Sequence, residues 1–245
     1  MHATLPLALL LTTALAAPSA SPRVTFDARH LGVKAVVRDV PAERTVDDPL
    51  VFPAPRHVEA TFGPRDGGDT RELDVYGVAD LLALRANVAR SEIEALRALL
   101  KPRAALPSKP GALPFLPRVP AAQLLNGAAK IVTFTGGSGV RYLTAFSQEL
   151  APVTRAQVFY TFQGLTADGK YYVSLQWPVS LTELPTGYDA PDTKKVLAEL
   201  ASADETRANA AWTAYVTRTK RELDRLTNDA RLTKLDAFVK SIRVR

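Results

Sequence analysis

The strongest constraint on this chain is a pair of alternating segments joined by Asp168-Gly169. Residues 157–164 and 170–178 both alternate apolar with polar side chains, which is typical of half-buried strands. Asp-Gly between such segments predicts a β-hairpin with a type I′ turn, because both central residues of that turn need positive φ. With this dipeptide in the turn, Ala167 pairs with Lys170 and one register follows for the whole hairpin.

This register separates an apolar face of the hairpin from a polar one. Phe162 lies opposite Leu175, and Tyr160 lies opposite Trp177. Slipping the pairing by one residue would exchange the two faces, so only one assignment can hold. The polar face of the hairpin then consists of Thr161, Gln163, Tyr172, Ser174 and Gln176, with Gln163 opposite Ser174 and Thr161 opposite Gln176.

The hairpin belongs to a larger sheet. Nine of the 18 aromatic residues lie between Ala129 and Pro178, which marks the centre of the core or a binding platform. Alternation predicts six further strands at 24–26, 33–37, 57–62, 72–78, 130–135 and 139–147.

Helical spacing appears on both sides of this central stretch. It predicts a helix over 78–88 and another that begins at a Ser91–Glu94 capping box and stops at Pro102. Towards the carboxyl end it predicts helices at 193–200 and 204–226 and a last one ending near Ser241. In the long helix, Trp212, Val216, Leu223 and Leu226 form one stripe that should face the sheet. The expected fold class is α+β, an antiparallel sheet with helices packed on one face and long C-terminal helices.

The amino terminus has the pattern of a secretion signal. The apolar run from Leu5 is shorter than the roughly 20 residues that span a bilayer, and it is followed by Ala14-Leu15-Ala16, a small-residue cleavage site. We expect residues 1–16 to be the signal peptide and 17–245 a single α+β domain. A second cleavage before Ser21, an uncleaved anchor and a buried helix are the alternatives. A possible internal boundary is the Pro-rich connector 101–120, which we interpret as a surface crossover.

Charge and cysteine content limit the cellular compartment and the partners that we expect. The chain has no cysteine, so it holds no disulfide and no lipid-anchoring cysteine, and we expect a soluble protein in the periplasm, cell envelope or medium. Its net charge is +6, which favours an acidic envelope polymer or an envelope protein as partner, or simply keeps the chain in solution. No nucleic-acid-binding module is recognisable, and no cofactor is expected.

Three long phrases carry a family resemblance. They are LPFLP from Leu113, GSGVRYLT from Gly137 and FYTFQGLTADGKYYVS from Phe159 to Ser174. In this order they resemble a family of uncharacterised exported bacterial proteins, over about a third of the chain. The resemblance implies export and a common fold, and no activity. This chain has Gly136 where relatives often carry Asn, and lacks the lipobox cysteine that many of them have.

Candidate chemistry is sparse. The loop Gly137, Ser138 and Gly139 is not a nucleophile elbow because Val140 occupies the position that needs glycine, but it could form an anion nest beside Arg141. His30 and His57 are isolated in the sequence, so we interpret them as surface or loop histidines and expect no metal site. No catalytic residue is assigned.

The polar hairpin face is the remaining candidate site. Together with Arg141, its residues Thr161, Gln163, Tyr172, Ser174 and Gln176 could bind a glycan or an extended peptide; otherwise this face is solvated or covered by a helix. We therefore expect an exported, non-catalytic cell-envelope module that binds an acidic polymer, a glycan or a partner protein. The alternative is a hydrolase that acts on cell-envelope material.

Overall fold

The computed structural model describes residues 21–43, 53–63, 71–84, 86–102 and 104–245. The expected signal segment, 1–16, lies outside these residues. Among the residues described, no helix combines the length and the apolar character needed to cross a membrane.

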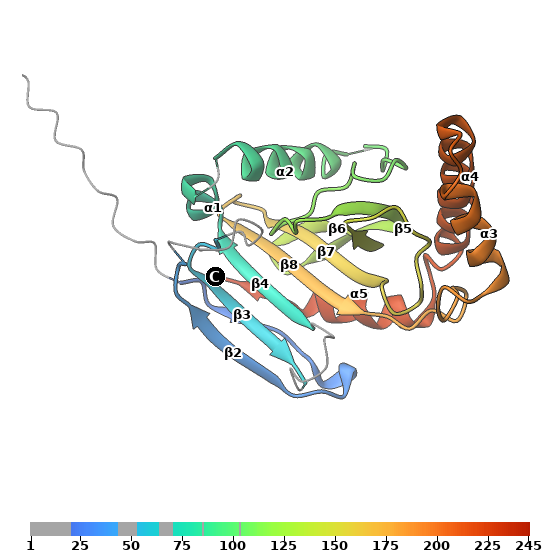
Figure 1. Cartoon of the computed structure of the whole chain (residues 1–245). Coiled ribbons are helices and arrows are strands. Elements are labelled where there is room, and N and C mark those ends of the chain that lie inside the picture. The colour runs from blue at the N-terminus through green and yellow to red at the C-terminus, as the bar shows by residue number, and fades with distance from the viewer. Residues whose placement is uncertain (1–20, 44–52, 64–70, 85, 103) are drawn as a thin grey trace, which may run out of the picture.

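A seven-stranded antiparallel sheet organises the molecule, in the order β2-β3-β4-β8-β7-β6-β5 (Figure 1). A separate pair, β1 and β9, joins the beginning of the described chain to its end. With the helices, this sheet confirms the expected α+β class. The strands are β1 (Val24–Thr25), β2 (Ala35–Val40), β3 (His57–Phe62), β4 (Glu72–Gly77), β5 (Ala122–Phe134), β6 (Gly137–Ser147), β7 (Phe159–Thr166), β8 (Tyr171–Pro178) and β9 (Arg243–Val244).

Helices lie on both sides of the sheet and beyond one edge. Figure 1 shows α5 under one face, α1 and α2 over the other, and the α3–α4 pair standing next to β5. Helices therefore pack on both faces of the sheet, whereas the sequence predicted them on one face only. The helices are η1 (Arg29–Leu31), α1 (Val78–Leu84), α2 (Ala86–Leu99), α3 (Pro191–Leu200), α4 (Glu205–Asp224) and α5 (Ala230–Ser241).

The hairpin register is confirmed, but the turn is of another type. Tyr160 pairs with Trp177, and Phe162 with Leu175. Gly169 has φ of 69° and its N–H donates to the Thr166 carbonyl at 2.8 Å, whereas Asp168 does not have a positive φ. The tight turn therefore spans Thr166 to Gly169, with no positive φ at its two central residues, as in a type I turn, and the loop is longer than the two residues of a type I′ hairpin. This turn and the predicted type I′ turn give the same strand register, so the same side chains share each face of the hairpin.

Each face of the sheet has its own apolar core. Phe162 and Leu175 pack with Phe238 of α5 on one face. On the other face, Tyr142 and Tyr172 pack with apolar residues of α2 and of the Pro-rich connector, which are Ile93, Leu96, Leu113, Phe115 and Leu116. The connector therefore belongs to the core, and strands from both sides of it pair at β4 and β8.

Two helix predictions are wrong in detail. Ser91 does not begin a helix: it lies inside α2, where its hydroxyl donates to the Val88 carbonyl at 2.9 Å. In α4 the buried stripe is Tyr215, Thr219 and Leu223, while Trp212 is only half-buried. The predicted stripe still borders the core, because Leu223 belongs to both stripes and Trp212 and Leu226 pack against the core as partly buried residues. Packing against β5 decides which side chains of this face are fully buried, and periodicity alone does not specify that.

Candidate metal centre

The polar hairpin face is buried beneath the connector. Gln163 is fully buried, and its Oε1 accepts from the Tyr172 hydroxyl at 2.5 Å and from the Leu116 N–H at 3.0 Å. Its Nε2 donates to the hydroxyls of Thr161, at 2.9 Å, and Ser174, at 3.1 Å. All four hydrogen bonds of the amide are thereby used within the fold. Of the expected binding residues on this face, Gln176 alone is half-buried.

The expected anion nest is not formed. Gly137, Ser138 and Gly139 lie in β6 and pair with both β5 and β7, so their backbone is extended rather than curled around an anion. Glycine is required at Gly139 for another reason: a Cβ there would lie 2.4 Å from the Gln163 carbonyl oxygen.

Arg141 is also part of the fold. Its side chain is fully buried, and its Nε donates to Asp236 Oδ1 at 3.0 Å. Its other nitrogens donate to the carbonyls of Ala128 and Thr227. The guanidinium joins β6 to α5 and has no surface for an external ligand.

The buried polar face continues across the sheet towards its β2 edge. In register, Gln163 lies opposite Ser174, Ser174 opposite Asp74, and Asp74 opposite Glu59. His57, two residues before Glu59 on β3, projects to the same face, because alternate residues of a strand share a side. Pairing of β3 with β4 thus brings one imidazole and two carboxylates together.

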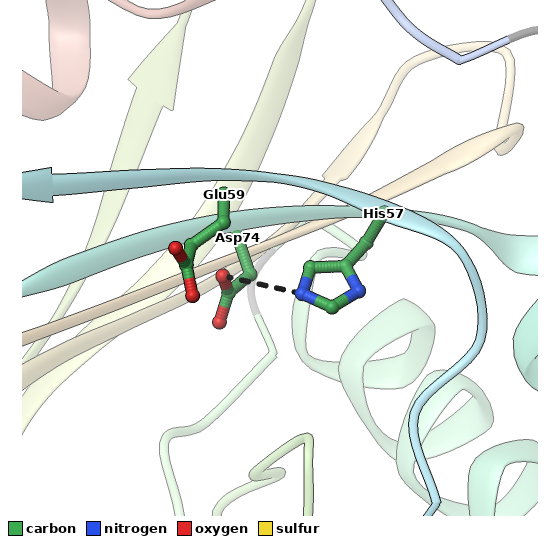
Figure 2. Close-up of side chains that lie close together, drawn as sticks. All are labelled: His57, Glu59 and Asp74. Atoms are coloured by element: carbon green, nitrogen blue, oxygen red, sulfur yellow. Dashed lines mark ion pairs between the residues drawn. The ribbon is translucent and has the colours of Figure 1, made fainter. Parts of the chain in front are cut away.

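His57 is oriented as a ligand. The ring is stacked on Tyr76, with centroids 4.7 Å apart, and Nδ1 lies 2.8 Å from the Pro55 carbonyl oxygen. A carbonyl only accepts, so Nδ1 carries the proton and the neutral ring has its lone pair on Nε2. Nε2 faces Asp74 Oδ1 at 3.9 Å (Figure 2). Metal-bound histidines commonly donate their other ring N–H to a backbone carbonyl in this way.

Asp74 hydrogen-bonds with Glu72 and Tyr76, but one of its carboxylate oxygens is unsatisfied. Its side chain is 2% exposed, and Oδ1 has no hydrogen-bond partner within the described part of the chain. Burial raises the pKa of Asp74 well above its usual range, and the nearby carboxylates of Glu72 and Glu59 raise it further. The metal-free site therefore favours a proton on Asp74.

Three carboxylates, those of Glu59, Glu72 and Asp74, gather at the cluster, and the Arg38 Nε donates to Glu59 Oε1 at 2.6 Å. A divalent cation bound between these carboxylates would favour their ionised form, so that Asp74 would not need a proton.

The donor set and its spacing suit a first-row transition metal. One ligand atom from each of His57, Glu59 and Asp74 can be chosen so that all lie within 4.8 Å of one another. Tetrahedral zinc with bonds of about 2.0–2.2 Å needs ligand atoms about 3.3 Å apart, so binding requires small side-chain rotations. Imidazole with carboxylates favours zinc or its neighbours, whereas calcium takes six to eight oxygens.

The interpretation of His57 as a surface or loop histidine is wrong, since it lies in β3 and is buried. His30 lies in η1. The sequence does contain a signal for this site. His57 and Glu59 are two residues apart in one predicted strand, so they share a face, and Asp74 lies in the next predicted strand. The site also requires β3 to pair with β4, and alternation within each strand does not specify that pairing.

Comparisons with known proteins do not assign the chain to a family. No family model, no curated protein and no solved structure matches the chain.

Proposed function

We propose that this chain is an exported, non-catalytic module that binds one divalent transition-metal ion at His57, Glu59 and Asp74. The observation that carries the proposal is the buried Asp74 Oδ1, which lies without a hydrogen bond 3.9 Å from the lone-pair nitrogen of His57. A buried carboxylate oxygen without a hydrogen bond is costly, and a metal bond would compensate it.

Zinc is the probe of choice. Untagged, metal-free protein titrated with zinc chloride at neutral pH should bind one ion per chain in calorimetry. Zinc should also raise the unfolding temperature, because a ligand specific to the native state stabilises it. Binding should release a proton, since a coordinating carboxylate must be ionised.

Asp74→Asn is the decisive variant. It keeps the shape of the side chain and removes its charge, so it should abolish the zinc-induced stabilisation while the metal-free protein stays folded. Asp189→Asn is the matched control, because the Asp189 carboxylate is fully exposed and forms a surface ion pair with Lys194. Unchanged zinc affinity in Asp74→Asn, or no one-to-one binding by the parent protein, would overturn the proposal.

Export and an envelope location belong to the same proposal. They are supported by the apolar run and small-residue motif of residues 1–16 and by the family resemblance of the segments from Leu113 to Ser174. The net charge of +6 supports an acidic envelope component as the partner.

A further inference from the structure

A groove of about 700 Å³ lies between the connector and α4, next to the β5 edge of the sheet. The metal centre is on β3 and β4, towards the opposite edge (Figure 1). The volume is within the range of small-ligand sites. We call this feature the α4 groove; its lining includes Lys109, Pro110, Trp212, Val216, Thr217 and Arg221.

Both walls of the α4 groove are anchored to β5. The connector wall is held by Asn126 Nδ2, which donates to the Lys109 carbonyl at 2.8 Å. The helix wall is held by Asp224, whose Oδ1 accepts from the Ala128 N–H at 2.8 Å. The groove is therefore formed before any ligand arrives, which reduces the entropy cost of binding.

The inner surface of the α4 groove is aromatic and apolar. Trp212 is half-buried and stacks on Tyr215, with ring centroids 5.4 Å apart and planes at 27°. Tyr215 is fixed in turn, because its hydroxyl accepts from the Val153 N–H at 2.6 Å. The indole is thus held in place as one wall of the groove, and Val216 one turn away extends the apolar strip.

Cations line the rim of the α4 groove. Lys220 is neutralised by Asp224, at 2.9 Å. Lys109 and Arg221 are exposed and have no ion pair within the described ranges, so they give the groove two uncompensated positive charges. A second copy that met this face with its own groove across a two-fold axis would bring the same charges and be repelled.

We propose that the α4 groove binds a segment of an acidic polysaccharide. A uronic-acid unit offers the two features that the groove complements, an apolar ring face for Trp212 and a carboxylate for Lys109 or Arg221. The hydroxyl of Thr217 can exchange hydrogen bonds with the ring hydroxyls. Acidic peptides carry their carboxylates on flexible stems and present no such ring. The inference uses the proposed envelope location but is independent of the metal centre.

Tryptophan fluorescence provides a local readout. The chain has two tryptophans, so Trp177→Phe leaves Trp212 as the sole emitter. Short galacturonic acid oligomers should change its emission saturably, and added salt should weaken the binding because the charges are exposed. Neutral glucan oligomers of equal length and a poly-glutamate peptide of equal charge should bind at least about tenfold more weakly.

Variants assign the binding to the α4 groove. Lys109→Glu with Arg221→Glu should weaken galacturonate binding by about tenfold or more, as should Trp212→Ala followed by calorimetry. Lys234→Glu with Lys240→Glu, the same charge change on exposed positions of α5, is the matched control and should change affinity by less than about twofold.

The outcomes separate this site from the metal centre. Asp74→Asn should bind galacturonate normally, whatever its zinc affinity. Absence of galacturonate binding, equal binding of poly-glutamate or neutral glucan, or full affinity in folded groove variants would each overturn the inference. Circular dichroism of every variant verifies that it is folded.

Discussion

The Nε of Arg141 donates to Oδ1 of Asp236 at 3.0 Å, in a position where both side chains are buried. The Tyr160 hydroxyl donates to the same oxygen, also at 3.0 Å. This contact joins the central strands to α5, which lies 95 residues further along the chain. It is one of the main polar links between the sheet and the helix below it.

Breaking this ion pair from one side should be costly. Asp236→Asn leaves the Arg141 charge buried and uncompensated, so the free energy of unfolding should fall by about 3–5 kcal/mol. Urea unfolding measures this. The double variant Arg141→Met with Asp236→Leu should be less destabilised than the single one, because it removes both charges. A loss below about 1 kcal/mol in Asp236→Asn would contradict the buried pair.

Gln163 and Gln176 should respond differently to truncation. Gln163→Ala removes the partner of the Tyr172 hydroxyl and of the Leu116 N–H, so it should cost about 1–3 kcal/mol of stability. Gln176 is half-buried, and within the described ranges its side chain belongs to no such network, so Gln176→Ala should cost about 0.5 kcal/mol or less. Equal effects in chemical denaturation would show that the polar face is not sealed by the connector.

Asp74 should make metal-free stability depend on pH. Its pKa is raised in the folded chain, so above the unfolded value of about 3.9 the native state retains a proton that the unfolded state has lost. The free energy of unfolding should therefore fall as pH rises from 5 to 7, by at most about 1.4 kcal/mol per pH unit from this group.

Asp74→Asn isolates this effect. The amide does not titrate, so the variant should lack this decline and gain stability relative to the parent chain as pH rises. Saturating zinc should reverse the decline in the parent chain only. Parallel pH profiles for the two metal-free proteins would be inconsistent with a protonated Asp74.

Gly139 should not tolerate a side chain. A methyl group there would lie 2.4 Å from the Gln163 carbonyl oxygen and 2.5 Å from the Phe162 ring, so Gly139→Ala should destabilise by about 1–3 kcal/mol. Gly187→Ala is the control, since nothing lies within 4 Å of its added Cβ and its φ is not positive. Thermal unfolding of both variants distinguishes strand-specific crowding from a general glycine effect.

Export can be tested directly. If residues 1–16 are a signal peptide, amino-terminal sequencing of exported protein should begin at Ala17, or at Ser21 if the second cleavage is used. Recovery of the chain from the cytoplasm with Met1 intact would contradict the proposal.

Local sequence information determined the hairpin register, most strand positions and the α+β class. Alternation specifies which residues share a face, and a Gly-containing turn specifies which residues lie opposite, so both are readable over a few residues. The turn type was not determined, because both geometries give the same alternation.

Only the tertiary structure decided what covers each face and which distant side chains meet. The Leu116 N–H reaches Gln163 across 47 residues, which turns an expected binding face into a buried network. His57, Glu59 and Asp74 meet because β3 pairs with β4, and Arg141 becomes structural because α5 brings Asp236 to it. Such contacts follow from the packing of whole layers of secondary structure. The free energy of that packing is a sum over many residues, so no short segment of the sequence predicts it.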